Sequence, residues 1–107
     1  MSLSMAFEAF LHPKSVAVIG ASRDPSKIGG SVLANLMAGG FPGRIIPVNS
    51  RGEVVQGLRS VASLLDAEGP IDLAAIAVPA TSVLPVLKEC VAKGVSGAVV
   101  ISSNFRE

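Results

Sequence analysis

Ser15–Gly30, which reads SVAVIGASRDPSKIGG, is the stretch that decides the fold of this chain. Its first part, Ser15–Ile19, is mostly apolar and rich in β-branched residues, as in a buried strand. A loop rich in Gly, Ser and Pro begins at Gly20, and a helical pattern starts at Ser26 or Lys27. A strand, a loop and a helix in this order form the first unit of a parallel α/β fold.

The rest of the chain supplies further strands of the same kind. They are predicted at Arg44–Val48, Asp72–Val78 and Ala98–Ile101, and Glu53–Val55 is a candidate for a very short extra strand. Pro47 removes a ladder donor, so it is expected late in its strand or at a bulge. The continuous apolar run in 72–78 suits a strand near the middle of the sheet. The predicted fold class is α/β, a Rossmann-like doubly wound parallel sheet of about five strands in three α/β/α layers.

Three helices are predicted between the strands. The first presents one apolar face and ends at Gly39-Gly40. A brief second helix is capped by Ser60. The third is capped by Thr81 or Ser82 and accepts Pro85 in its first turn, where a missing N–H costs nothing. Its inward side chains are expected to be Val83, Leu84, Leu87 and Val91.

Composition limits the classes of function. The 107 residues suffice for one domain, residues 1–107, and half of them are hydrophobic with Phe as the only aromatic type. The formal net charge of +1 leaves no broad basic face for nucleic acid and no polybasic run for a membrane surface. No apolar run reaches the roughly 18 residues of a membrane span. These features predict a soluble cytoplasmic protein without nucleic-acid or membrane partners.

Both ends of the chain carry an expectation. Residues 1–5 contain a second methionine and show no pattern, so we interpret them as a possible leader from an expression vector. The chain ends six residues after its last predicted strand, at Glu107. This favours a fragment of a longer multidomain protein.

Neither the lone cysteine nor the lone histidine predicts chemistry. Cys90 lies in an apolar helical pattern, which indicates a core residue and excludes an internal disulfide. His12 precedes a proline before the first strand, away from the strand ends that bind ligands, and has no carboxylate or serine partner at recognisable spacing. One cysteine and one histidine cannot assemble a usual zinc site. We expect no catalytic residue and no metal in this chain.

The loops after the four main strands are the predicted binding region, because ligands of open parallel sheets bind beyond the carboxyl ends of the strands. Gly20 and Gly29 stand too far apart for the compact G-x-G-x-x-G turn of NAD enzymes. After the second strand, where NAD enzymes place a carboxylate, this chain has Arg51. A cation there favours a phosphorylated ribose, as in NADP or coenzyme A. Lys27 would add charge at a pyrophosphate held by the amides of Ile28 and Gly29.

Structural interpretations stand beside these. Gly29 and Gly30 are also explained by a close approach of helix and sheet. Arg51 alone is typical of a solvated loop charge. Pro79 serves as a strand terminator, and Thr81 or Ser82 as a helix cap. Ser102 and Ser103 have the composition of a simple turn.

Several segments, taken in order, resemble one known family. They are Leu11–Ser22 (LHPKSVAVIGAS), Lys27–Gly29, Ile46–Asn49, Asp72–Ala80, and Ile101–Ser103 followed by Phe105 and Glu107. Together they resemble the CoA-binding domain of the NDP-forming acyl-CoA synthetases, relatives of the succinyl-CoA synthetase α subunit. The resemblance covers nearly the whole chain from Leu11 onward.

The resemblance implies coenzyme A as the bound cofactor and assigns a part of it to each loop. The first loop and the start of the first helix would hold the pyrophosphate, and 49–51 would flank the adenosine and its 3′-phosphate. Residues 78–80 would contact the adenine or pantetheine side, and 101–103 would line the path toward the thiol. The implied cofactor-binding residues are Gly20, Ala21, Ser22, Arg23, Lys27, Ile28, Gly29, Asn49, Arg51, Val78, Pro79, Ala80, Ile101, Ser102 and Ser103.

The resemblance also implies a parent enzyme. Such ligases join an acid to CoA with ATP or GTP through an acyl phosphate and a phosphohistidine that lies in a later domain, so this chain is expected to bind CoA or acyl-CoA without turnover. Its partners would be the remaining ligase domains or subunit.

The chain departs from the family at two places, Ser50-Arg51 in place of Pro-Lys and Asn104 in place of Gly. Arginine keeps the cation, and asparagine tolerates a positive φ. The alternatives are a regulatory domain of a protein acetyltransferase, a stand-alone CoA-binding protein, and an NADP-binding oxidoreductase domain.

Overall fold

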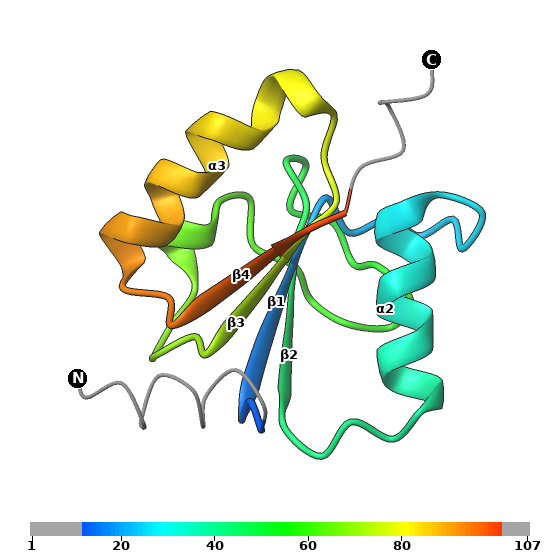
Figure 1. Cartoon of the computed structure of the whole chain (residues 1–107). Helices are drawn as coiled ribbons and strands as arrows, with labels where there is room; N and C mark the ends of the chain where they lie inside the picture. Colours follow the sequence, from blue (N-terminus) through cyan, green and yellow to red (C-terminus); the bar gives the residue numbers. More distant parts are fainter. Residues whose placement is uncertain (1–11, 102–107) are drawn as a thin grey trace.

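The computed structural model describes residues 12–101 and shows a parallel sheet with helices on both of its faces (Figure 1). The strands are β1 (Ser15–Ile19), β2 (Arg44–Val48), β3 (Leu73–Ile76) and β4 (Gly97–Val100), in the spatial order β2-β1-β3-β4. All neighbouring strands pair in parallel. The Rossmann-like α/β class is confirmed. Of the five or so strands expected, the described residues form these four.

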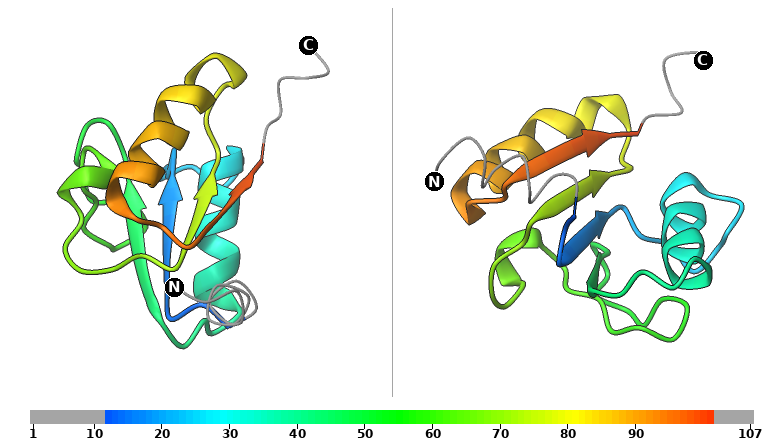
Figure 2. Two further views of the ribbon diagram at one scale, coloured as in Figure 1. Left: turned by 60° about the vertical axis from the view of Figure 1, so that its left-hand side comes forward. Right: turned by 60° about the horizontal axis from the view of Figure 1, so that its bottom comes forward.

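The helices divide the core into two halves. Helix α2 (Ile28–Ala38) packs over Val16 and Val18 of β1, whereas α3 (Ala80–Lys93) packs over Ala17 and Ile19 on the other face (Figure 2). The short 3₁₀ helix η1 (Leu64–Asp66) lies beside α3. Successive β1 side chains point to opposite faces, so the buried run in 15–19 is explained by a helix on either side.

The position of each strand explains its composition. β1 and β3 are the two inner strands and are almost completely buried, as predicted for the apolar run in 72–78. β2 is an edge strand, so Pro47 near its end removes no donor from an inner ladder. β4 is the other edge, and its residues Val99 and Val100 are exposed.

The first helix matches its prediction in its bounds, but Met37, expected on its apolar face with Val32, Leu33 and Leu36, is exposed. Lys27 is the N-cap, the buried side chain of Leu33 faces the sheet, and Gly39 is the C-cap. Among residues 12–101, no helix is both long and apolar enough to cross a membrane.

Three local predictions were wrong. Glu53–Val55 is not a strand of the sheet, because Val55 forms only an isolated bridge with Leu58. Ser60 does not cap a helix: its hydroxyl donates to the Glu53 carbonyl, and Ser63 caps η1 instead by accepting from the Leu65 N–H. Both misplacements arise because the chain between β2 and η1 is held by contacts distant in sequence.

The third error concerns α3. The helix begins at Ala80 with Pro79 as its N-cap, so Thr81 and Ser82 lie inside its first turn and Pro85 in its second. Its inward face carries Val86, Leu87 and Cys90, whereas Leu84 and Val91, expected inside, are exposed. Its end at Gly94 follows from the left-handed conformation there, φ +79°.

Candidate functional site

The candidate site lies where the carboxyl ends of β1, β2 and β3 meet. β1 is flanked by β2 and β3, and the helices that follow β1 and β3 cover opposite faces of the sheet. The strand order therefore reverses between β1 and β3, and a crevice opens at such a point in parallel sheets. The loops after β1, β2 and β3 all border it.

The first loop is fastened to the ends of the neighbouring strands. The N–H groups of Gly20 and Ala21 both donate to the Val48 carbonyl, at 3.0 and 3.1 Å. Gly20 has φ +91°, and a Cβ there would stand 2.2 Å from the Ala77 carbonyl oxygen. Only glycine meets both conditions, so this residue sets the path of the loop over β3.

Gly29 and Gly30 allow α2 to touch the first loop. A Cβ on Gly29 would lie 1.8 Å from the Gly20 carbonyl oxygen, and one on Gly30 would lie 2.0 Å from that of Asp24. Both glycines are buried. Close backbone packing therefore accounts for them, and it brings the first turn of α2 against the loop.

The first loop is also braced from within. Asp24 accepts hydrogen bonds from the Ser26 hydroxyl and N–H, at 2.7 and 2.9 Å, and its own N–H donates to Ser22 Oγ. The pKa of the Asp24 carboxyl is lowered, most of all by the hydrogen bond from the Ser26 hydroxyl. The Ser26 N–H and the nearby charge of Lys27 make smaller contributions in the same direction. The N-cap residue Lys27 gives α2 no side-chain cap, so the first-turn amides keep their capacity for another acceptor.

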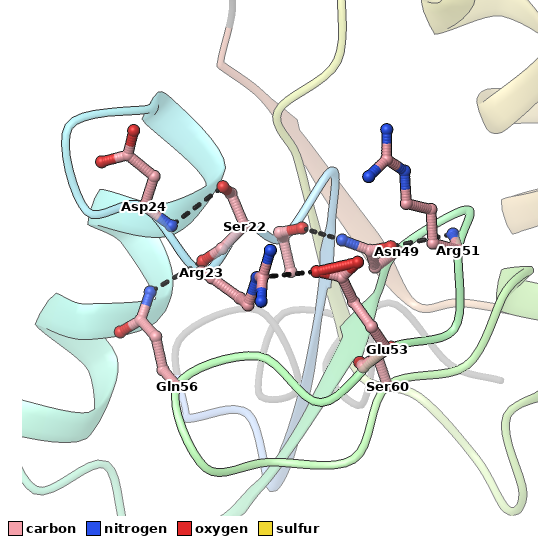
Figure 3. A network of polar contacts seen from close by, with 9 residues as sticks. Ser22, Arg23, Asp24, Asn49, Arg51, Glu53, Gln56 and Ser60 are labelled. Carbon is pink, nitrogen blue, oxygen red and sulfur yellow. Dashed lines mark hydrogen bonds and ion pairs between the residues drawn. The ribbon is translucent and has the colours of Figure 1, made fainter.

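The second loop is joined to the first by an asparagine. Asn49 Nδ2 donates to the Ala21 carbonyl at 2.9 Å, and Asn49 Oδ1 accepts from the Arg51 N–H at 2.8 Å (Figure 3). The turn closes through a 2.7 Å bond from the Gly52 N–H to the Asn49 carbonyl. Asn49 therefore fixes both the separation of the two loops and the place from which the Arg51 side chain extends.

Two further contacts cross between the loops. Arg23 Nε and Glu53 Oε1 form an ion pair at 2.8 Å, and Gln56 donates to the carbonyl of Ser22 (Figure 3). Gln56 also donates to the carbonyl of Gly30. The Arg23 side chain is 70% exposed and that of Glu53 29% exposed. Within the described part of the chain this is the only ion pair, so the other two cations beside it, Lys27 and Arg51, have no carboxylate partner there.

These loops enclose a polar pocket of about 630 Å³. Its lining residues are Ser22, Arg23, Asp24, Lys27, Asn49, Ser50, Arg51 and Glu53. The lining carries three cations and two carboxylates, and because Glu53 pairs with Arg23, the side chains of Lys27 and Arg51 are left to meet an anionic group of a ligand. Such a pocket suits phosphate groups.

A second, narrower pocket of about 220 Å³ continues from the first. Ser22 and Lys27 line both. The remaining lining residues are Gly20, Ile28, Gly29, Ala77, Val78, Pro79 and Ile101. This pocket thus joins the first loop, the start of α2, the end of β3 and the residue after β4.

Most of the predicted site residues come together in these two pockets. Ala21 does not line them, since its side chain is buried beneath the loop, but its carbonyl carries the Asn49 contact. Ala80 is exposed at the start of α3 and lines neither pocket. Ser102 and Ser103 lie outside the described residues.

The lone histidine and cysteine lie elsewhere. His12 is exposed before β1 and lines an apolar cavity of about 900 Å³ between α2 and the sheet. That cavity carries Lys14 among mostly apolar side chains and none of the three cations of the polar pocket. Cys90 is buried against the opposite face, as predicted, and burial, with a smaller contribution from Glu89, raises the pKa of its thiol. Residues 12–101 contain no cluster of three or more acidic, histidine or cysteine side chains that could hold a metal.

Sequence reasoning missed four residues of the site: Asp24, Glu53, Gln56, and Ala77, which lines the narrower pocket. Asp24 had a local signal, because an Asp-Pro-Ser run is typical of a turn in which the Asp side chain accepts from a residue further on. Glu53 and Gln56 had none, since their partners lie some thirty residues earlier in the chain.

Comparison with known proteins points to one family. Residues 14–107 match the family model described as a CoA binding domain. The chain is 48% identical over 96 residues to acetate–CoA ligase (ADP-forming) II of Archaeoglobus fulgidus, covering 90% of this chain and 14% of that protein. It is 44% identical over 107 residues to the α subunit of acetate–CoA ligase (ADP-forming) I of Pyrococcus furiosus, covering 96% and 23%.

A solved structure agrees with the sequence relatives. The fold superposes with a TM-score of 0.87 and 41% identity on acetyl-coenzyme A synthetase 1 of Candidatus Korarchaeum cryptofilum, a structure in complex with phosphate and ADP. The match covers 94% of this chain and 22% of that one. The chain therefore spans less than a quarter of the length of each of these proteins.

Proposed function

The chain belongs to the CoA-binding domain family, and from this premise we propose that it binds coenzyme A across the carboxyl ends of β1, β2 and β3. One observation carries the proposal. The polar pocket, with Lys27 and Arg51 free of ion pairs within the described residues, opens into the narrower pocket at the start of α2. CoA needs two such neighbouring spaces, one for its charged nucleotide end and one for its thin pantetheine arm.

The pyrophosphate is assigned to the junction of the two pockets. There the uncapped first turn of α2 presents its amides, and Lys27 and Ser22 line both spaces. A helix N-terminus stabilises an anion through its free N–H groups and its dipole, and an adjacent ammonium adds to this. The tight packing of Gly29 on Gly20 supports the assignment because it brings backbone, without side chains, to this point.

The 3′-phosphate of the adenosine is assigned to Arg51. Its guanidinium extends from an exposed loop whose base is held by Asn49, and a guanidinium can donate two parallel hydrogen bonds to a phosphate. The family position usually carries lysine, so arginine keeps the charge and adds this geometry.

The pantetheine arm is assigned to the narrower pocket. Val78, Pro79 and Ile101 line it. Ser102 and Ser103 follow directly and would continue this path toward the thiol. Ala80, at the exposed start of α3, would contact the adenine or the pantetheine from outside the two pockets.

The parent protein is proposed to be an NDP-forming acyl-CoA synthetase. The relatives named above are ADP-forming acetate–CoA ligases, and one of them is the α subunit of such an enzyme. In this proposal the chain holds CoA while the remaining domains or a partner subunit perform the acyl transfer, so the isolated chain turns nothing over. Its location is proposed to be cytoplasmic, and the free buried thiol of Cys90 is consistent with that.

A fifth strand and a complete three-layer arrangement belong to the same proposal. The edge strand β4 exposes Val99 and Val100, whereas parallel sheets are normally buried on both faces. We propose that further chain pairs with this edge in the intact protein.

Calorimetric titration of the chain with CoA, dephospho-CoA, NADP and NAD tests the ligand class. CoA is expected to bind most tightly and dephospho-CoA more weakly, because it lacks the 3′-phosphate. NADP binding as tight as that of CoA would favour an oxidoreductase domain, and the absence of binding to all four compounds would remove the assignment.

An activity assay of the full-length protein distinguishes the proposed ligase from a regulatory or stand-alone CoA-binding protein. The full-length protein, incubated with CoA, acetate, ATP and Mg²⁺, is expected to release ADP continuously only when both acetate and CoA are present, because phosphorylation of the histidine by ATP alone yields a single equivalent of ADP per site. CoA binding without this dependence would point to a regulatory domain.

A further inference from the structure

Gln56 adopts a backbone conformation that glutamine normally avoids. Within the described part of the chain it is the only residue other than glycine with a positive φ, +49°. It begins a two-residue turn in which Val55 and Leu58 exchange both of their backbone hydrogen bonds at 2.9 Å, and Gly57 also has a positive φ of +85°. Such turns favour Asn, Asp or Gly at the first central position. A glutamine there indicates that interactions of its side chain compensate for the unfavourable backbone conformation.

The side chain makes two well-formed contacts with the first loop. Gln56 Nε2 donates to the Ser22 carbonyl and to the Gly30 carbonyl, both at 2.9 Å. Both amide hydrogens are therefore used. One acceptor belongs to the loop after β1 and the other to the first turn of α2, so a single amide group sets the separation of these two segments.

The turn that carries Gln56 is itself anchored in the core. Val55 is fully buried and packs in the same cluster as Leu33 of α2. The tip of the turn reaches the site, while its base is held by the core on the α2 face. The Gln56 side chain therefore extends from a residue directly next to the buried Val55, and we interpret the turn as a rigid support for the first loop.

Gln56 does not line either of the two pockets described above. Its partner Ser22 lines both, and Gly30 directly follows Gly29, which lines the narrower one. The glutamine therefore acts on the site through the backbone of residues 22–30 and would make no contact with a ligand at these positions.

We propose that Gln56 is a positioning residue for CoA: its amide holds the first loop against the start of α2 so that the loop and the first-turn amides meet the pyrophosphate together. This inference rests on the proposed function for the identity of the ligand. In this proposal the unfavourable backbone conformation of Gln56 is explained by its side chain, which is long enough to reach the carbonyls of both Ser22 and Gly30 from the turn.

Replacement by glycine separates this role from a merely structural one. Gln56→Gly removes the amide but suits the positive φ, so relief of the backbone offsets part of the two lost hydrogen bonds and the melting temperature is expected to change little. CoA binding is expected to weaken about tenfold, as when hydrogen bonds that hold a site are lost. Gln56→Asn also tolerates the turn but is too short to reach both carbonyls, and it should weaken CoA similarly. Val54→Ala, at an exposed neighbour, is the control and should change neither quantity.

Hydrogen exchange of the ligand-free protein completes the test. In Gln56→Gly the backbone amides of residues 20–30 are expected to exchange faster than in the original chain, while those of β3 keep their rates. Unchanged exchange in 20–30, or a melting temperature that falls while CoA affinity stays constant, would overturn the inference. If the original chain fails to bind CoA, the proposed function fails alone, because the exchange comparison still decides whether Gln56 positions the loop.

Discussion

Gly29, in the first turn of α2, lies so close to Gly20, just after β1, that a Cβ atom on Gly29 would stand 1.8 Å from the Gly20 carbonyl oxygen. The clash would be with backbone, which cannot rotate away. The contact therefore couples the stability of the domain to the shape of its proposed ligand site.

Gly29→Ala is expected to lower the free energy of unfolding by about 3 kcal/mol, because overpacking against backbone forces α2 away from the loop. Gly52→Ala is the control: Gly52 has φ +64° but nothing within 4 Å of a Cβ, so only the left-handed conformation is penalised, by about 1 kcal/mol. Urea unfolding of both variants measures the difference. Equal losses would show that α2 has room to shift.

Asn49→Asp is expected to weaken the tie between the first two loops. The change removes the donor to the Ala21 carbonyl and leaves two oxygens facing each other, at a cost of about 1–3 kcal/mol in unfolding free energy. CoA should also bind more weakly, because a carboxylate enters a pocket for phosphates. Asn35→Asp, at an exposed position of α2, introduces the same charge and should leave both values nearly unchanged. Equal changes of unfolding free energy and CoA affinity in the two variants would show that the hydrogen bond from Asn49 to Ala21 does not hold the loops together.

Arg51→Glu is expected to weaken CoA by about 1–3 kcal/mol, the range for a lost charge-assisted contact, and dephospho-CoA much less. The selective loss follows from the assignment of the 3′-phosphate to this guanidinium. Arg59→Glu reverses a charge at an exposed position that lines neither pocket and serves as the control. Calorimetry with both ligands is the measurement, and equal losses for the two would place Arg51 away from the phosphate.

Glu53→Gln is expected to strengthen CoA binding by a few fold. The carboxylate occupies Arg23 and adds a negative charge beside the polar pocket, and both effects disappear in the variant. The unfolding free energy should change by less than about 1 kcal/mol, since the pair is partly solvated. The gain should shrink as salt is added, because exposed charges are screened. Unchanged affinity at low salt would show that Arg23 does not reach the ligand.

Cys90 predicts a loss of stability at alkaline pH. Burial raises the thiol pKa in the folded state above its ordinary value, so the protonated form favours folding. This contribution is complete below the unfolded-state pKa and declines as pH rises from there through the folded-state pKa. Cys90→Ala lowers stability overall by lost packing but lacks this decline. The unfolding free energies of the original chain and of Cys90→Ala, measured under reducing conditions, should therefore approach each other as the pH rises from about 7 to about 10.

The strands and the first helix followed from local signals. The β-branched run of 15–19 and the apolar run of 72–78 describe strands covered on both faces, and those faces are covered by α2 and α3. The ends of the two helices were equally visible, because glycine best adopts the left-handed conformation that follows a helix, as Gly40 does after α2 with φ +71° and Gly94 after α3 with φ +79°.

The segment between β2 and η1 did not follow from local signals. Ser60 looks like a helix cap, but the return of the chain along β2, where the Val61 N–H donates to the Pro47 carbonyl at 3.0 Å, places it in a different role. α3 was assigned a late start because Thr81 and Ser82 are good caps, whereas the end of β3 lets Pro79 begin the helix directly. For Ser60 a contact distant in sequence outweighed a local preference, and for α3 the chain path out of β3 did.

The sequence by itself determined the α/β class, the position of each main strand and the four loops that carry the family resemblance, because these depend on apolar periodicity and on turn residues within a few positions. Only the tertiary structure decided which side chains brace the site. Glu53 and Gln56 reach partners about thirty residues away, and such contacts exist only after β2 and β1 pair and bring the two loops together.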